Sequence, residues 1–260
     1  MSAPLSGKVA IVTGAGSGLG RGSALALARA GARIAINDVE EAGADETLRQ
    51  VEEVGGAGSV EIADVSVAGE VAEMVRRVEA RYGRLDVMHA NAGVERYESL
   101  ETMKEPDLDL LLDVDLKGSL LCAQAAIPAL RRAGGGSVIF TSSVQASHSL
   151  PGCVAYAAAK AGLVAAARTL ALEVGPDSIR VNTISPGTID TPMLRRDLGD
   201  LGIPEQEDFL KRVREANALS RIGTPEEIGD AVVFLASDRS SYVTATDLVV
   251  DGGFTAVKTF

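Results

Sequence analysis

Short runs of aliphatic residues alternate with longer amphipathic segments through most of the chain. Each run is followed by a stretch long enough for a helix, as residues 19–30 follow residues 9–14. The runs lie at residues 9–14, 33–38, 59–64, 85–93, 136–143, 179–187 and 247–253. They are continuous in Val, Ile and Leu rather than alternating, which is typical of parallel strands buried on both faces. The pattern predicts an α/β fold with a seven-stranded parallel sheet and helices on both faces.

Residues 191–221 break this rhythm. The segment is charged and is interrupted by Gly199, Gly202 and Pro204, which predicts short helices. We interpret it as a substrate lid inserted before the last long helix, with an ordinary surface excursion as the alternative. The length of the chain suits one domain over residues 1–260.

Composition and charge narrow the range of partners. The net charge of −11 disfavours binding to nucleic acid or to an anionic membrane, and solubility is its simpler meaning. No apolar run is long enough to span a bilayer, and the N-terminal residues lack a signal-peptide pattern. Cys122 and Cys153 have neither the number of a disulfide framework nor metal-ligand spacing. We therefore expect a cytoplasmic protein without a metal site.

A glycine-rich turn follows the first predicted strand. Its glycines allow a tight bend and a close approach of the backbone, and the next helix would present free N–H groups to a phosphate. A purely structural turn is the alternative, but the position between a strand and a helix favours a dinucleotide site. The candidate cofactor contacts in this turn are Gly14, Ser17, Gly18, Leu19 and Gly20.

Asp38 ends the second predicted strand, where an acidic residue would bind the adenosine ribose hydroxyls. Its carboxylate would repel a 2′-phosphate, and the glycine turn holds no arginine or lysine to receive one. NAD is therefore favoured over NADP as the cofactor. The alternative role for Asp38 is a cap on the following helix.

Tyr156 and Lys160 are spaced four residues apart in a segment that predicts a helix. Residues with this spacing share a helix face, so the phenol and the ammonium can reach one pocket. A phenol titrates near pH ~10, and a nearby positive charge lowers that value. The tyrosine could then accept a proton from an alcohol or return one to an alkoxide. Alone, such a pair could also be a surface contact.

Together with the glycine turn, this pair makes the chain resemble the short-chain dehydrogenase/reductase family over nearly all of its 260 residues. Ser143, thirteen residues before Tyr156, and the Asn-Ala-Gly sequence at residues 91–93 stand at matching positions. The resemblance implies a Rossmann-like, doubly wound fold. It also implies further cofactor contacts from Asp64, Val65, Asn91, Ala92, Gly93, Tyr156, Lys160, Pro186, Gly187, Ile189 and Thr191.

The resemblance implies a catalytic set of Ser143, Tyr156, Lys160 and the residue at position 115. Tyr156 is implied as the base in oxidation and the acid in reduction, Lys160 as the group that lowers its pKa, and Ser143 as a hydrogen-bond donor to the substrate oxygen. Position 115 departs from the family, which has Asn where this chain has Asp115. We expect Asp115 to remain active, to hold the charge of Lys160 more firmly and to alter the pH response.

The substrate pocket is predicted beside the Asn-Ala-Gly turn, the segment before Tyr156 and the lid. The candidate substrate-binding residues are Ser143, Glu95, Gln145, Cys153 and Tyr156. Polar side chains at Glu95, Gln145, Ser147 and His148 suit a substrate with several hydroxyls, and loosely resemble some sugar dehydrogenases of the family. The alternative is that Glu95 and His148 face solvent. The lid's basic residues could capture an anion, but its acidic residues favour a mixed, solvated surface.

The leading prediction is an NAD-dependent oxidoreductase that oxidises a secondary alcohol, with a sugar or polyol as the favoured class. A ketoreductase of a biosynthetic pathway and a non-catalytic NAD-binding scaffold are the alternatives. The small, apolar segment at residues 161–175 favours packing against another subunit, and the resemblance implies a homotetramer. The C-terminal sequence at residues 254–260 could reach a neighbouring pocket.

Overall fold

Seven parallel strands form one sheet, in the order β3-β2-β1-β4-β5-β6-β7. The computed structural model describes residues 3–199 and 202–256. The strands are β1 Val9–Val12, β2 Arg33–Asp38, β3 Ala57–Ile62, β4 Val87–Ala90, β5 Gly136–Thr141, β6 Ile179–Pro186 and β7 Asp247–Val250. All neighbouring pairs run parallel. The predicted Rossmann-like, doubly wound sheet is thereby confirmed.

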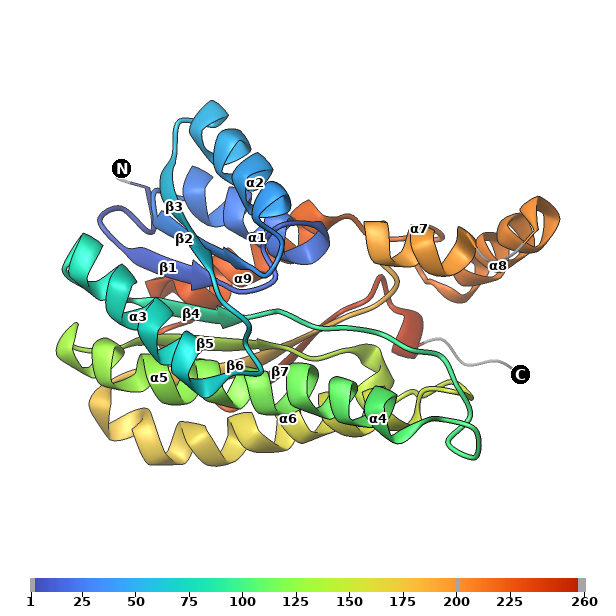
Figure 1. Cartoon of the computed structure of the whole chain (residues 1–260). Helices are drawn as coiled ribbons and strands as arrows, with labels where there is room; N and C mark the ends of the chain where they lie inside the picture. Colours follow the sequence, from blue (N-terminus) through green and yellow to red (C-terminus); the bar gives the residue numbers. More distant parts are fainter. Residues whose placement is uncertain (1–2, 200–201, 257–260) are drawn as a thin grey trace.

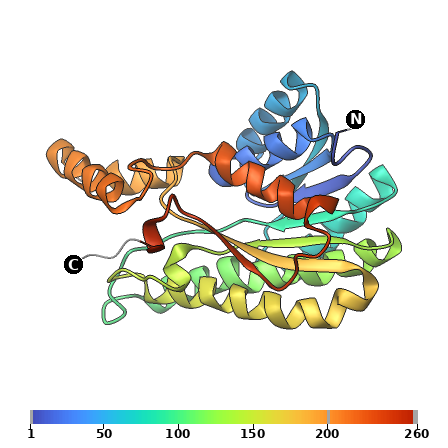
Figure 2. The ribbon, with the colours of Figure 1, turned by 180° about the vertical axis from the view of Figure 1, so that it is seen from behind.

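Helices pack on both faces of the sheet (Figures 1 and 2). They are α1 Gly18–Arg29, α2 Glu41–Glu53, α3 Ala68–Tyr82, α4 Glu105–Leu111, α5 Ser119–Arg132, α6 Val154–Val174, α7 Pro192–Gly199, α8 Ile203–Ala216 and α9 Pro225–Ala236. Ala10 and Val12 of β1 join the core under α1, α2 and α9, whereas Val9 and Ile11 join the core under α3, α5 and α6. Because both faces of the strand are covered, its sequence is continuously apolar.

The abundance of glycine has one clear use in the packing of α1 against α9. A Cβ added at Gly22 would lie 2.6 Å from Pro225 Cβ, and one added at Gly229 would lie 2.7 Å from the Gly22 carbonyl oxygen. The two helix backbones therefore touch at a distance that a larger residue would not allow.

The functional site follows from the strand order. The chain runs outward from β1 to β3 and then returns to the centre at β4, so the direction of winding reverses between β1 and β4. In an open α/β sheet, ligands bind outside the carboxyl ends of the strands at this reversal. The glycine turn after β1 and the Asn91–Gly93 turn after β4 both lie there.

The segment between β6 and α9 forms two helices, α7 and α8, which extend away from the sheet (Figure 1). The α8 helix has no buried residue, and Ile203 at its start is 73% exposed. The short helices expected at residues 191–221 are therefore present, although α8 reaches 14 residues. The role of this segment as a substrate lid stays a prediction, as does the single domain over residues 1–260.

Candidate functional site

The turn after β1 has the backbone shape that its glycines predict. Gly14 and Gly18 have φ angles of 61° and 51°, in the left-handed region. A Cβ at Gly20 would lie 2.2 Å from the Gly14 carbonyl oxygen, so only glycine lets α1 begin so close to the turn. Ser17 makes no side-chain cap, which leaves the first N–H groups of α1 without that partner. This cradle fits a dinucleotide pyrophosphate.

Asp38 lies at the end of β2, directly beside the glycine turn. Its Oδ2 accepts a hydrogen bond from Gly16 N at 2.8 Å, and its Oδ1 accepts one from Glu40 N at 3.0 Å. Arg21 is close by, but its guanidinium donates to the carbonyl oxygens of Gly16 and Gly43 and to Thr47 Oγ1. The Asp38 carboxylate and the Arg21 guanidinium therefore both stabilise the turn. The Arg21 guanidinium already donates its hydrogen bonds to oxygen atoms of the protein.

Asn91 ties the ends of three strands together. Its Nδ2 donates to Thr13 O at 3.0 Å, and its Oδ1 accepts from Thr141 Oγ1 at 3.1 Å. Thr13 Oγ1 accepts from the backbone N–H groups of Asn91 and Ala92, at 2.9 and 3.0 Å. These bonds fix the glycine turn against the carboxyl ends of β4 and β5.

The remaining candidate cofactor residues lie on connections at the same edge of the sheet. Asp64 Oδ1 accepts from Ser66 N and Oγ, and Val65 is buried. Gly187 N donates to Val250 O at 3.0 Å, and Ile189 pairs with Gly223 in an isolated bridge. Thr191 Oγ1 accepts from Leu194 N at 3.3 Å at the start of α7.

The structure brings Ser143, Tyr156 and Lys160 together. Ser143 follows β5, and its hydroxyl accepts a hydrogen bond from Gln145 N at 3.2 Å. The Ser143 side chain also acts to lower the pKa of Tyr156. Lys160 lies one turn after Tyr156 on α6, and its Nζ is 5.3 Å from the centroid of the Tyr156 ring. Two hydroxyls and an ammonium at one point can move a proton to or from a substrate oxygen.

Asp115 joins this group from another element. It lies in a π-helical segment, Leu112–Gly118, between α4 and α5, and is completely buried. Its Oδ1 accepts from Val94 N at 2.7 Å, and its Oδ2 lies 3.4 Å from Lys160 Nζ. Lys160 Nζ also donates to Thr141 O at 3.2 Å. The chain forms a π-helical segment here, which is a frequent feature of functional sites.

The electrostatics of Tyr156 differ from the expectation based on Lys160 alone. Burial raises the pKa of Tyr156 above its usual range, and the carboxylates of Glu95 and Asp115 raise it further. Burial also raises the pKa of Asp115, and Lys160 only partly offsets that effect. Burial and the two carboxylates therefore oppose the lowering of the Tyr156 pKa that is expected from Lys160, and that role of Lys160 stays a prediction.

On the substrate side, the structure separates the polar candidates. Glu95 is half-buried, and its charge acts on the pKa values of Tyr97, Cys153 and Tyr156. Gln145 is buried, and its Oε1 accepts from Leu150 N at 2.9 Å, so its amide also holds the adjoining loop.

The other two polar candidates lie outward. Ser147 and His148 are exposed and share a hydrogen bond of 3.0 Å between Ser147 Oγ and His148 Nδ1. The solvent-facing alternative therefore fits His148, whereas Glu95 is partly shielded from solvent and stays a candidate.

Arg195, Lys211 and Arg212 of the lid segment have acidic partners. Arg195 makes two hydrogen bonds to Asp190, at 2.8 and 2.9 Å, and Arg212 lies 2.7 Å from Asp208. Lys211 lies 3.9 Å from Glu215. This pairing supports the mixed, solvated surface over an anion-capturing one.

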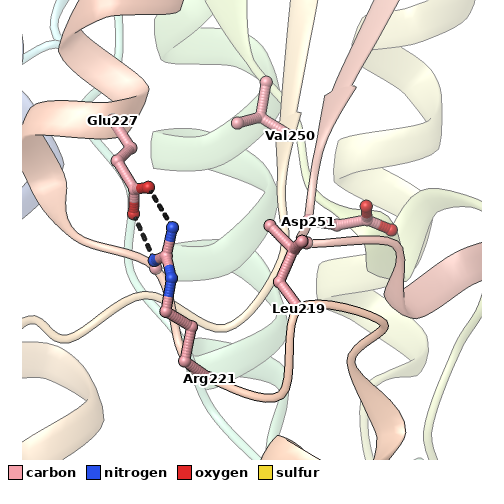
Figure 3. Close-up of a pocket in the computed structure, with 7 residues that line it drawn as sticks. Leu219, Arg221, Glu227, Val250 and Asp251 are labelled. Carbon is pink, nitrogen blue, oxygen red and sulfur yellow. Dashed lines mark hydrogen bonds and ion pairs between the residues drawn. The ribbon is translucent and has the colours of Figure 1, made fainter.

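A small cavity of about 100 Å³ lies where the end of the lid segment meets the end of β7 (Figure 3). Its lining includes Leu219 and Arg221, with Arg221 bound to Glu227 by hydrogen bonds of 2.6 and 2.8 Å. Val250 and Asp251 close it from β7. None of the catalytic candidates lines this cavity, so it is not the predicted substrate pocket.

Within residues 3–199 and 202–256, no group of His, Cys, Asp and Glu side chains could hold a metal ion. In the same part of the chain, no helix is both long and apolar enough to cross a membrane.

Residues 14–255 match the family model described as enoyl-(acyl carrier protein) reductase. The chain belongs to the short-chain dehydrogenase/reductase family. It is 37% identical over 251 residues to the 3-oxoacyl-[acyl-carrier-protein] reductase FabG of Thermotoga maritima, covering 96% of this chain and 98% of that protein. The resemblance based on the glycine turn and the Tyr-x-x-x-Lys pair is confirmed, and the protein is an oxidoreductase of a family that binds a nicotinamide cofactor.

Solved structures of the family are similar over almost the full length. Levodione reductase superposes with a TM-score of 0.94 at 33% identity, covering 98% of this chain and all of the other. A gluconate 5-dehydrogenase from Burkholderia cenocepacia, in complex with NADP and tartrate, gives a TM-score of 0.91 at 31% identity, covering 99% and 98%. Relatives with this same fold are thus named for different substrates.

Sequence reasoning missed several residues that build the site. Thr13 and Thr141 hold the strand ends through bonds that no local pattern reveals. Arg21 was missed because two of its partners, Thr47 and Gly43, lie on α2, beyond the strand β2. Tyr97 stood only two residues beyond Glu95, and its aromatic ring in a polar loop was the available signal.

Proposed function

We propose that this protein is an NAD-dependent dehydrogenase that oxidises a secondary alcohol, with Tyr156 as the acid–base group. The observation that supports this most directly is the position of Lys160 Nζ, 5.3 Å from the centroid of the Tyr156 ring, with Ser143 near enough to act on the Tyr156 pKa. A scaffold without catalysis would not need these three groups in one place.

Each member of the group has a distinct part in the proposed reaction. In oxidation, the Tyr156 phenolate oxygen accepts the proton of the alcohol, and in reduction the phenol returns it. The Ser143 hydroxyl donates a hydrogen bond to the substrate oxygen as negative charge develops there. The Lys160 ammonium favours the phenolate and opposes the two nearby carboxylates.

The chain's residues would hold a dinucleotide along the reversal between β1 and β4. The glycine turn and the start of α1 would bind its pyrophosphate, and Asp38 its adenosine ribose. Asp64 and Val65 would contact its adenine, while Asn91–Gly93, Lys160 and residues 186–191 would surround its nicotinamide end. The bound cofactor would supply the hydride acceptor, and the protein the orientation and the proton transfer.

The proposed preference for NAD rests on Asp38. A second negative charge placed beside this carboxylate would cost several kcal/mol, and Arg21 is already committed to carbonyl oxygens. We expect Asp38→Asn to lower the ratio of kcat/KM with NAD to that with NADP by at least ~10-fold. Glu40→Gln is the matched control, because it removes an exposed carboxylate two residues away. An unchanged ratio in Asp38→Asn would rule out Asp38 as the selector.

We propose a neutral substrate with several hydroxyls, such as a sugar or polyol. Glu95 places a half-buried carboxylate near Tyr156, where it could accept hydrogen bonds from substrate hydroxyls and would repel an anionic group. The lid cations named above are paired with acids and offer an anion little compensation.

The test is a panel of polyols, sugars, the matching sugar acids and cyclic alcohols, assayed with NAD and NADP. We expect NAD-linked activity with a neutral hydroxylated compound and a weaker rate with its acid. Glu95→Gln should narrow the gap between the two compounds by ~10-fold. Comparing two substrates within one variant removes any general effect of Glu95 on Tyr156. Glu101→Gln, an exposed carboxylate in the same loop, should leave the gap unchanged.

A second candidate function is a ketoreductase, which the 37% identity to a 3-oxoacyl-[acyl-carrier-protein] reductase supports. The same residues would then act in the opposite direction. Faster turnover of a 3-oxoacyl thioester with NADPH than of any alcohol with NAD would favour this second function. Asp38 argues against it through the expected weak binding of NADPH.

We also propose a cytoplasmic homotetramer. The α6 helix exposes Val154 and Leu172, at 52% and 79%, and α9 exposes Phe234 at 37%. These apolar side chains suit helix packing between subunits. Light scattering should give the mass of four chains, and a monomer at micromolar concentration would end this proposal. The C-terminal residues 257–260, expected to reach a neighbouring pocket, lie outside the described residues.

A further inference from the structure

His89 is a buried histidine of the strand β4 that lies outside the sets of candidate cofactor and catalytic residues. It is 0% exposed, and its ring Nε2 lies 2.9 Å from Thr141 Oγ1 at the end of β5. Its backbone carbonyl oxygen accepts from Thr13 N at 3.1 Å, where β1 leads into the glycine turn. One residue therefore contacts the carboxyl ends of both strands that flank β4.

The hydrogen bonds around Asn91 fix the direction of donation along a short chain of polar groups. Asn91 Nδ2 donates to Thr13 O at 3.0 Å, and a backbone carbonyl oxygen can only accept. The amide is therefore oriented with Oδ1 toward Thr141, whose hydroxyl donates to it at 3.1 Å. A hydroxyl has one proton, so Thr141 Oγ1 has none left to donate to His89. His89 Nε2 must then carry a proton and donate it to Thr141 Oγ1.

The other ring nitrogen of His89 identifies the form of the ring. Nδ1 is buried and has no hydrogen-bond partner in the part of the chain that the structure describes. A proton there would be an unpaired buried donor on a charged ring, which is the costlier arrangement. Burial also lowers the pKa of His89 to about 3, so the ring is neutral near pH 7. His89 is thus the neutral tautomer with its proton on Nε2.

The chain that begins at His89 ends at the edge of the sheet where the candidate cofactor residues lie. The Asn91 amide lies against the start of α1, since a Cβ added at Gly20 would be 2.7 Å from Asn91 Nδ2. Thr141 also presents its backbone oxygen to Lys160 Nζ at 3.2 Å. The placement of Thr141 consequently affects both the glycine turn and the lysine of the site.

We propose that His89 is a positioning residue for the bound nicotinamide dinucleotide. By donating from Nε2 to Thr141, it directs the Thr141 proton to Asn91 and so holds the Asn91 amide against the glycine turn. Without this donor, the Thr141 hydroxyl can rotate and donate elsewhere, which releases one side of the amide. The proposal rests on the proposed function in treating the glycine turn and Asn91 as the cofactor site. The position of the proton on His89 concerns this chain alone and can be tested without cofactor or substrate.

The first experiment locates that proton by nuclear magnetic resonance. The chain has two histidines, so labelling histidine with a heavy-nitrogen isotope gives only the ring signals of His89 and His148. His148→Gln assigns the signals, because that side chain is exposed and its removal leaves the buried ring in place. We expect a one-bond coupling between a proton and Nε2 of His89, with Nδ1 unprotonated, at neutral pH. A proton on Nδ1 and none on Nε2 would overturn the inference, since Nε2 would then accept from Thr141.

The second experiment measures the affinities for NAD and NADP by calorimetry, which needs no substrate. His89→Leu fills the space of the ring but removes the donor, and we expect the Kd of the preferred dinucleotide to rise roughly 3- to 10-fold. His89→Gln is the matched variant, because its amide can place an N–H near the position of Nε2. It should return the Kd to within about 2-fold of wild type. An unchanged Kd in His89→Leu would overturn the inference, and so would equal weakening in both variants, which would indicate packing and not donation.

A double-mutant cycle tests the chain itself. Thr141→Val removes the hydroxyl, keeps the shape of the side chain and should weaken dinucleotide binding by a similar factor. Adding His89→Leu to Thr141→Val should weaken binding no further, because the chain is already broken. Fully additive losses, with each variant shown to be folded by circular dichroism, would overturn the inference.

Asn182→Leu is the control for the loss of a buried polar group from the same sheet. Asn182 lies on β6, and its amide bonds to Val243 O at 3.0 Å and to Thr246 N at 3.2 Å, in the segment before β7. This variant should lower stability without changing the Kd. If the protein prefers NADP or turns over no alcohol, the proposed function fails, while a raised Kd in His89→Leu that is restored in His89→Gln still supports the inference.

Discussion

Asp86 and Asp115 are buried carboxylates that lie beyond opposite ends of β4. Asp86 precedes β4 at the amino ends of the strands, and its Oδ2 accepts from Val9 N at 3.0 Å and from Arg84 Nε at 2.8 Å. Its Oδ1 accepts from Arg84 Nη2 at 2.6 Å and from Lys8 Nζ at 3.1 Å. Asp115 lies beyond the carboxyl ends, with one hydrogen bond and one ammonium at 3.4 Å.

The difference in hydrogen bonding shifts the pKa values of the two carboxyl groups in opposite directions. Burial opposes the ionisation of Asp86, but its hydrogen bonds from Arg84, Val9 and Lys8 outweigh burial and hold its pKa below the usual range. For Asp115, burial prevails and raises the pKa. Asp86 is a satisfied group that stabilises the fold, whereas Asp115 is an under-satisfied group at the site. Perturbed charges of the second kind are typical of functional sites.

The largest expected effect is a loss of activity when the site near Asp115 is changed. Tyr156→Phe should lower kcat by ~10³-fold, because general acid–base catalysis contributes about 10²–10⁴. NAD binding, measured by calorimetry, should remain within about 3-fold of wild type, since the ring and Lys160 stay in place. Tyr242→Phe is the control, because that ring is fully exposed. Retained turnover in Tyr156→Phe would contradict its role.

A smaller effect is expected on stability at the other end of the strands. Asp86→Asn should lower the free energy of unfolding by about 2 kcal/mol, since it removes a charge that pairs with Lys8 and Arg84. Activity per folded molecule should not change. Urea unfolding measures the loss, and Asp177→Asn, which breaks the more exposed pair with Arg131, should cost less than about 1 kcal/mol.

The pH dependence of stability separates the two carboxylates further. The folded-state pKa of Asp86 is lowered, so its contribution is fully present above the unfolded value near pH ~4 and is lost as pH falls through the folded value. The stability of the wild type and of Asp86→Asn should therefore converge in acid. Parallel curves down to the lowest pH that preserves the fold would contradict this assignment.

The smallest expected effect is that of Asp115→Asn on stability. The folded-state pKa of Asp115 is raised, so the ionised group is costly at neutral pH, and the cost is relieved as pH falls through the folded value. An amide removes that cost but also removes a partner of Lys160, and the net change should stay within about 1 kcal/mol. If Asp115→Asn lowered the free energy of unfolding as much as Asp86→Asn does, both carboxylates would be groups that stabilise the fold.

The sequence by itself determined the fold and supplied the main candidate residues of the site. Continuous aliphatic runs are visible locally because burial on both faces leaves no polar alternation, and β2 begins and ends at the predicted residues 33–38. The glycine turn and the Tyr156–Lys160 pair are also local, since a tight turn and a helix face are set by spacings of a few residues.

Only the tertiary structure decided the electrostatics of the site. Glu95 and Asp115 lie 61 and 41 residues before Tyr156 in the chain, and the packing of the π-helical segment and the turn after β4 against α6 brings their charges to it. The pKa of a buried group depends on every charge around it and on the water it has lost. Those quantities are properties of the folded arrangement, so spacing along the chain predicted the partners Tyr156 and Lys160 but not the two carboxylates that act on Tyr156.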